Sequence, residues 1–334
     1  MIGFGVFVRD NDDLITDIDD FQAADARREA AISAGDVPAE VQSTLEMANI
    51  ISGIDNKNIA ADVSVAVAAG AAFEDFSMAL SIRSDAIGAG TVTETSQTVL
   101  EVIDDTKNIV NIEGVIATEY GLSLAKDFQI MQRKVSIGIK PKIVDLQSFS
   151  YREAMLTIDG EDELTNDDNK KDLGDFTTVD LGAAIDLSES FRLGLTVRNL
   201  VTDEFDIDLG VIDGVPVTGK LNFDTEARLG LAYHTNFFTL AVDYDLKENQ
   251  PLLSNPVFDS LKTQYLAVGA EFNAFDFAQL RVGARKNLAD GIAASAKDTA
   301  ITAGIGFWLG FNLDVAAVYA ENSVGGFLQA GFRF

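Results

Sequence analysis

Five arginines stand at alternate positions of apolar segments, and they are the side chains of this sequence best suited to bind a ligand. Arginine presents a planar fork of N–H donors that matches a carboxylate, so these residues predict an anion-attracting patch. Carboxylates occur on the same faces in similar number, which leaves open a second interpretation, in which the two signs pair and fill a polar interior. The arginines are Arg192, Arg198, Arg228, Arg281 and Arg285. The other charged residues expected on these faces are Lys134, Lys140, Lys142, Asp180, Asp186, Glu226, Asp243, Asp245, Glu271 and Asp314.

The sequence offers little for catalysis or for metal binding. It has one histidine, His234, and no cysteine, which removes most metal sites and most acid–base mechanisms that depend on histidine. The acidic stretch 10–20 and the pair Asp167–Asp168 could hold calcium or magnesium, but their spacing does not match an EF-hand loop, and a solvated acidic loop is favoured. We therefore predict that the protein is not an enzyme and has neither a metal nor a cofactor.

Charge and apolar content exclude two further classes of protein. Acidic side chains number 53 against 25 basic ones, a net charge of −28, so a nucleic-acid partner is excluded. Hydrophobic residues make up 47% of the chain, yet no run approaches the roughly 18 uncharged apolar residues of a membrane-spanning helix. Apolar residues instead alternate with small, polar and charged ones, as in a β-barrel that has lipid on one face and water on the other.

Alternation defines fourteen segments of strand length. In the segment 191–199, for example, Phe191 and Leu193 face one side while Arg192 and Arg198 face the other. Bacterial single-chain barrels have an even number of strands, so the predicted fold class is an all-β transmembrane antiparallel barrel of about fourteen strands. The predicted strands are 1–9, 59–73, 75–83, 111–127, 132–148, 175–187, 190–200, 223–234, 236–246, 263–272, 277–287, 298–309, 311–319 and 325–334.

Short and long links between these strands alternate, as periplasmic turns and extracellular loops do in such barrels. Phenylalanines beside the short links predict an aromatic girdle at one membrane interface. The short links fall at Glu74, 128–131, 188–189, Thr235, 273–276 and Gly310, and the long ones at 10–58, 84–110, 149–174, 201–222, 247–262 and 288–297. The girdle residues are Phe73, Phe76, Phe128, Phe191, Phe237, Phe272, Phe277 and Phe311.

Two of the long links differ from the others in composition. The first, 10–58, is rich in helix-forming residues and has Leu14, Ile18 and Phe21 at helical spacing, so we predict a pair of helices over 11–34 and 37–53 in an extracellular loop. The stretch 161–175 is predicted to be a solvated or disordered polar loop. The whole chain, 1–334, is then one barrel domain. Its first residues alternate like a strand, so we expect that an export signal preceded Met1.

The C-terminal residues GGFLQAGFRF end in alternating apolar and aromatic residues, Phe332 and Phe334 among them. This ending resembles the signal by which the barrel-assembly machinery recognises its substrates. Several segments resemble the TraF-like outer-membrane proteins, whose family name refers to conjugal transfer and which are related to the FadL-type long-chain fatty acid transporters. The segments are DLITDIDDFQ (13–22), EYGLSLAKDF (119–128), GIKPKIVDLQSFSY (138–151), FRLGLTVRNL (191–200), ARLGLAYHTN (227–236) and LRVGARKNL (280–288).

The resemblance implies a barrel of fourteen strands in the bacterial outer membrane, in contact with lipid and lipopolysaccharide and built by the barrel-assembly machinery. FadL-type barrels also have an N-terminal plug with an Asn-Pro-Ala motif, which this sequence lacks. A strand kink opens a lateral gate in that family, and Pro141 is the candidate for such a wall kink here, with a simple bulge at the rim as the favoured alternative.

Three functions remain open from the sequence. The first is FadL-like uptake of a hydrophobic or amphipathic small molecule, captured by the loop helices and passed into the barrel. The second is a structural or partner-binding envelope barrel, and the third is a general porin. Uptake requires apolar residues in the lumen, and Phe7 and Trp308 are the aromatic residues expected to point inward. A porin requires an open polar bore.

Overall fold

The structure is a computed structural model. It describes residues 1–10, 13–54, 57–158, 169–212, 215–250, 253–254, 262–275, 277–290 and 299–333. The pair Asp167–Asp168 and Phe334 lie outside the described residues.

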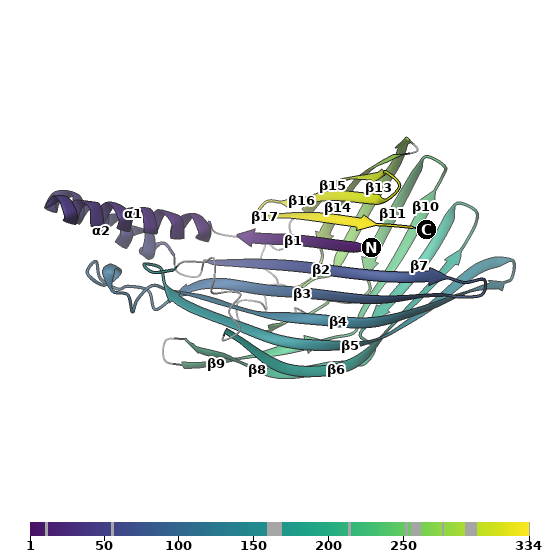
Figure 1. Ribbon diagram of the computed structural model, residues 1–334, viewed down its shortest axis with the longest axis horizontal. Coiled ribbons are helices and arrows are strands. Elements are labelled where there is room, and N and C mark those ends of the chain that lie inside the picture. Colours follow the sequence, from purple (N-terminus) through teal and green to yellow (C-terminus); the bar gives the residue numbers. More distant parts are fainter. Residues whose placement is uncertain are drawn as a thin grey trace.

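Fourteen antiparallel strands close into a barrel, because β1 (Ile2–Asp10) pairs with both β2 (Asn58–Ala72) and β17 (Ser323–Gly331) (Figure 1). Every predicted strand is present, so the predicted fold class is confirmed. The other barrel strands are β3 (Ser77–Thr93), β4 (Ile109–Ile130), β5 (Arg133–Ala154), β6 (Lys170–Asp186), β7 (Phe191–Arg198), β10 (Glu226–His234), β11 (Phe238–Asp245), β13 (Tyr265–Phe275), β14 (Ala278–Asn287), β15 (Thr299–Trp308) and β16 (Asn312–Ala320).

Large apolar side chains cover the outer face of the barrel. Leu80, Val282 and Ile301, on three different strands, are 62%, 54% and 60% exposed, and each of the fourteen strands has at least one comparable residue. An apolar surface of this extent is unfavourable in water, so the belt is stable only in contact with lipid. The predicted phenylalanine girdle lies at the short-turn end, where Phe73 stacks on Phe76 with ring centroids 4.8 Å apart.

The barrel wall is much taller on one side. Strands β4 and β5 have 22 residues each, whereas β7 and β11 have 8. A tilted strand crosses the hydrocarbon core in about 9–11 residues, so the long strands β2 to β6 project beyond the membrane at the long-loop end (Figure 1).

Three predicted strand limits were wrong because of this projection. Strand β3 continues to 93 rather than 83, β5 to 154 rather than 148, and β6 begins at 170 rather than 175. Residues 170–175, predicted as part of a polar loop, therefore belong to a strand. The charged residues in this stretch suggested a loop. A strand that lies outside the membrane can carry them, because its outer face contacts water and need not be apolar.

The two predicted helices are confirmed as α1 (Leu14–Ala34) and α2 (Val37–Ser52) (Figure 1). The turn between them uses Gly35 at φ +70°, and the side chain of Asp36 accepts a hydrogen bond from the backbone N–H of Ala39 to begin α2. The helices pack on the outer face of the projecting wall, where Phe21 and Met47 join a buried cluster with Val110 and Met155. In the described part of the chain, neither helix is long and apolar enough to cross a membrane.

A small sheet inside the long links was not predicted. It consists of β8 (Asp203–Ile212), β9 (Val215–Phe223) and β12 (Leu253–Ser254), in the order β12-β9-β8. The links 201–222 and 247–262 therefore contain strands that pair with each other and not with the barrel.

The short turns lie at the predicted short links, although residues 128–130 belong to β4 and residues 273–275 to β13. The turn between β4 and β5 has only two residues, Met131 and Gln132, both in the left-handed region at φ 50° and 62°. Two-residue hairpins with positive φ at both positions match the twist of the flanking strands. Glycine and asparagine adopt these φ values more easily than methionine and glutamine do. Gly310, in the turn before β16, has φ +82° and satisfies the same requirement without strain.

Candidate functional site

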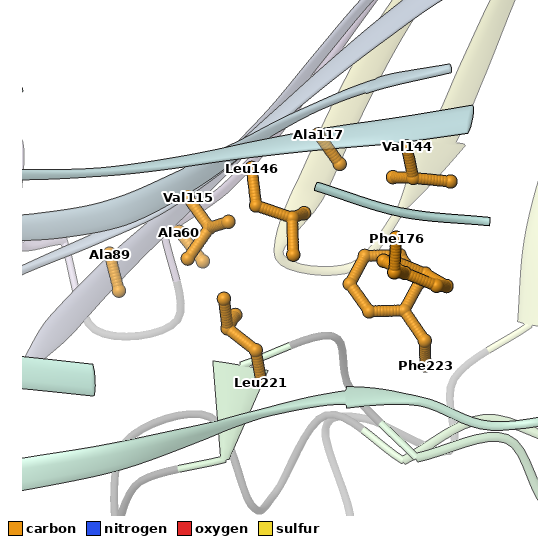
Figure 2. Close-up of a cluster of buried hydrophobic side chains, with 9 residues drawn as sticks. All are labelled: Ala60, Ala89, Val115, Ala117, Val144, Leu146, Phe176, Leu221 and Phe223. Carbon is orange, nitrogen blue, oxygen red and sulfur yellow. The ribbon is translucent and has the colours of Figure 1, made fainter. Parts of the chain in front are cut away.

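The hairpin β8–β9 lies inside the mouth of the barrel at the long-loop end. Its residues Leu221 and Phe223 are 0% and 6% exposed, and they pack on the inner face of the wall. Figure 2 shows these two side chains directed at Val115, Leu146 and Phe176 from β4, β5 and β6. The rings of Phe176 and Phe223 have centroids 4.6 Å apart. An apolar cluster therefore lies between the hairpin and the inner face of this wall.

A layer of ion pairs lies directly below this apolar cluster, on the same inner face. Lys142 on β5 is fully buried, and its Nζ lies 2.8 Å from Glu119 of β4 and 3.1 Å from Asp180 of β6. Arg198 of β7 continues the chain of contacts, 3.2 Å from Glu119 and 3.5 Å from Glu226 of β10. Opposite charges therefore connect five strands, and the partners offset much of the cost of burying each ion.

Cavities occupy the rest of the lumen. One of about 420 Å³ separates Phe223 of the hairpin from the charged wall and from Tyr265. A second, of about 570 Å³, follows β11 and β13 to β17, where inward positions are held by Gly269, Gly283 and Gly304. Small residues at these positions leave space that larger side chains would fill. A third, of about 720 Å³, opens at the short-turn end and is lined by Trp308.

The structure divides the five predicted arginines into two groups. Arg192 pairs with Asp186 at 3.2 Å, and Arg228 pairs with Asp245 at 2.6 Å. Arg281 lies 2.8 Å from Glu271 and also contacts Asp314. Together with Arg198, these arginines follow the paired interpretation that the sequence left open. Arg285 is different, because aromatic rings surround it instead of carboxylates.

Both predicted inward aromatics lie on the lumen side. Phe7 packs beside Ala300 and Val318, and its ring centroid lies 5.5 Å from the guanidinium carbon of Arg285. Trp308 lies at the short-turn mouth. Phe327, which lines the cavity of about 570 Å³, was not predicted from the sequence. Its alternation with Gly325 and Gln329, also on the inner face, was the available signal.

Pro141 lies within a continuous strand, paired with Val179 of β6. Towards β4 the ladder pairs Gly121 with Lys142 and Leu124 with Ile139, and it has no pairs between them. Proline lacks the N–H that this ladder needs, which accounts for the interruption. An apolar groove of about 570 Å³ lies beside this interruption. It is lined mainly by Val67, Leu80, Ile82, Tyr120, Leu122, Pro141 and Ile143, together with small residues such as Gly121 and with the polar residues Ser81, Lys142 and Thr177.

The described residues contain no group of three or more His, Cys, Asp or Glu side chains able to hold a metal ion. In the acidic stretch, Asp10 caps α1 by accepting from the backbone N–H of Leu14 at 2.9 Å, and Asp17 pairs with Lys57 at 2.6 Å. At the other terminus, Phe332 is 70% exposed and contacts the ring of Phe311 with centroids 5.6 Å apart.

A closed fourteen-stranded barrel with an apolar outer belt and a polar lumen defines a β-barrel membrane protein. The chain belongs to the family described as F plasmid transfer operon, TraF, protein, whose model matches residues 1–245. No curated protein matches the sequence.

Solved structures with a similar fold include two forms of a hydrocarbon channel. The toluene transporter TodX of Pseudomonas putida has 11% sequence identity and a TM-score of 0.52, over 98% of this chain and 86% of that one. A ΔS2S3 mutant of TodX, described as a monoaromatic hydrocarbon channel, has 12% identity and a TM-score of 0.56, over 100% and 89% of the two chains. At this identity the likeness shows the fold alone.

Proposed function

We propose that this protein is a FadL-like channel for the uptake of hydrophobic or amphipathic small molecules. The observation that carries the proposal is the apolar cluster of Leu221, Phe223 and Phe176 inside the long-loop mouth. Apolar side chains do not favour the passage of ions. An apolar ligand, in contrast, gains free energy when it leaves water and contacts them. The channel fold of TodX, a toluene transporter, supports the same class of cargo.

The ligand's path follows the cavities of the lumen. It begins at the hairpin, continues into the cavity between Phe223 and Tyr265, and reaches the glycine-lined cavity along β13 to β15. The wide cavity at Trp308 is the exit at the short-turn end. The apolar groove beside Pro141 is a second exit, towards lipid.

The location follows from the same architecture. Barrels of this kind reside in the bacterial outer membrane, with long loops outside and short turns on the periplasmic side. The apolar belt would then contact lipid and the projecting wall lipopolysaccharide. The exposed Phe332 near the C-terminus belongs to the segment that we expect the barrel-assembly machinery to recognise.

A partner-binding role is the second candidate, and one feature favours it. On α2, Val37, Val41 and Leu45 are 61%, 52% and 43% exposed, at intervals of four residues. They form an apolar stripe on the helix pair that extends outward from the barrel (Figure 1). The conjugation reference in the family name is consistent with a partner at this surface.

Uptake of radiolabelled toluene by cells producing the protein tests the channel proposal. A Cβ built at Gly269 meets nothing closer than the carbonyl oxygen of Val282 at 3.7 Å, so Gly269→Leu places a large side chain in the cavity without a backbone clash. We expect this variant to lower uptake to the level of cells without the protein. Gly326→Leu, on the lipid side and with open space around it, is the matched control and should leave uptake unchanged. Equal uptake with and without the protein would contradict the channel.

A further inference from the structure

Arg285 is a lumen guanidinium without a carboxylate partner. In the part of the chain that the structure describes, no carboxylate oxygen lies within 4.0 Å of it and it donates no hydrogen bond. Asp62 interacts with it only at longer range and lies 4.0 Å from Arg9. Asp243 is in the same ladder row, two strands away, and its side chain lies over Gly230. The donors of Arg285 are therefore available to a ligand.

Aromatic rings hold this guanidinium in position. Its carbon lies 4.8 Å from the ring centroid of Tyr265 and 5.5 Å from that of Phe7. Contacts of this geometry are attractive for a cation. The rings supply no hydrogen-bond acceptor, so the N–H donors of Arg285 that face the cavity could donate to a planar oxoanion.

The space next to Arg285 suits an apolar body. Arg285 lines the cavity of about 570 Å³, within the range of roughly 300–1,000 Å³ that is usual for small-molecule sites. The inward positions nearby are Gly283 and Gly304, and Phe327 lines the same space. The cavity is also lined by Arg281 and by three carboxylates, Asp243, Glu271 and Asp314, of which Glu271 and Asp314 pair with Arg281. A flat ring attached to the anion would fill this volume and contact aromatic surface.

We propose that Arg285, flanked by Phe7 and Tyr265, binds the carboxylate of a small aromatic acid whose ring occupies this cavity. The proposal rests on the channel function and names the class of its cargo. A carboxylate is favoured because one guanidinium fork matches its two oxygens, whereas a phosphate is usually held by several cations. The site would select anionic aromatic molecules over neutral ones of the same size.

Equilibrium dialysis of the full chain in a non-ionic detergent tests the site, with three radiolabelled probes. Benzoate has both the ring and the carboxylate, benzyl alcohol has the ring without the charge, and acetate has the charge without the ring. We expect benzoate to bind more tightly than either of the others. Arg285→Gln should weaken benzoate binding by at least about tenfold, because a charge-assisted bidentate pair is lost, and should leave benzyl alcohol unchanged. Arg285→Lys, which keeps the charge without the fork, should lie between the two.

Arg192→Gln is the matched control, because Arg192 is a lumen arginine paired with Asp186 and lines none of the described cavities; benzoate binding should be unchanged. Circular dichroism must show the same strand content in every variant. Benzoate affinity that survives Arg285→Gln, or equal affinity for benzoate and benzyl alcohol, overturns the proposal. Benzyl alcohol binding and toluene uptake without benzoate selectivity would overturn this site while leaving the channel function standing.

Discussion

At the scale of single residues, the lumen contains two kinds of charge. Lys142 is enclosed by Glu119 and Asp180 and connects strands, whereas Arg285 contacts aromatic rings and has no carboxylate partner among the residues that the structure describes. The sequence places both on the inner face by alternation alone. It cannot distinguish them, because the partner of a lumen side chain comes from a strand tens of residues away and depends on register and on side-chain reach.

Replacing Lys142 by alanine should destabilise the barrel strongly. The change leaves the carboxylates of Glu119 and Asp180 in a buried layer without the cation between them. Removing one partner of a buried ion pair lowers the free energy of unfolding by about 3 kcal/mol. The free energy of unfolding in urea, followed by Trp308 fluorescence, measures the effect. Lys134→Ala is the control: its pair with Asp127 is about half exposed, so the loss should stay below about 1 kcal/mol. Equal losses in the two variants would refute the structural role of the layer.

At the scale of elements, the regular parts of this chain were predictable. The fourteen strands and two helices follow from periods of two and of about 3.6 residues, which local sequence displays directly. The extension of β3 to Thr93 and the sheet of β8, β9 and β12 were not predictable in this way. Glycine and alanine obscure the alternation in 84–93, and the hairpin is stabilised by contacts such as Phe176 with Phe223 that are distant in sequence.

The turn at Met131 and Gln132 offers a second stability test. Both residues adopt left-handed backbone conformations that cost roughly 1 kcal/mol each for residues with a Cβ. Replacing the pair by Asn-Gly, which favours this hairpin geometry, should raise the free energy of unfolding by about 1 kcal/mol. Gly310→Ala, at φ +82°, should lower it by a similar amount. An unchanged or lower stability of the Asn-Gly variant would show that the turn is not strained.

At the scale of the whole molecule, the projecting wall organises the entrance. Its outer face carries the helix pair and its inner face carries the hairpin, so the long strands β2 to β6 support both (Figure 1). The inner face of this wall is consequently apolar at the hairpin, carries ion pairs next to it, and borders cavities beyond them. This arrangement fits a channel that blocks the free flow of inorganic ions and admits hydrophobic or amphipathic molecules.

Single-channel conductance in a planar bilayer measures whether the hairpin β8–β9 seals the lumen against inorganic ions. The unmodified protein should show no large steady conductance steps. Replacing Leu221 and Phe223 together by serine removes the apolar contacts that hold the hairpin and should produce frequent openings. Large steady steps from the unmodified protein would contradict the account and identify the barrel as an open porin.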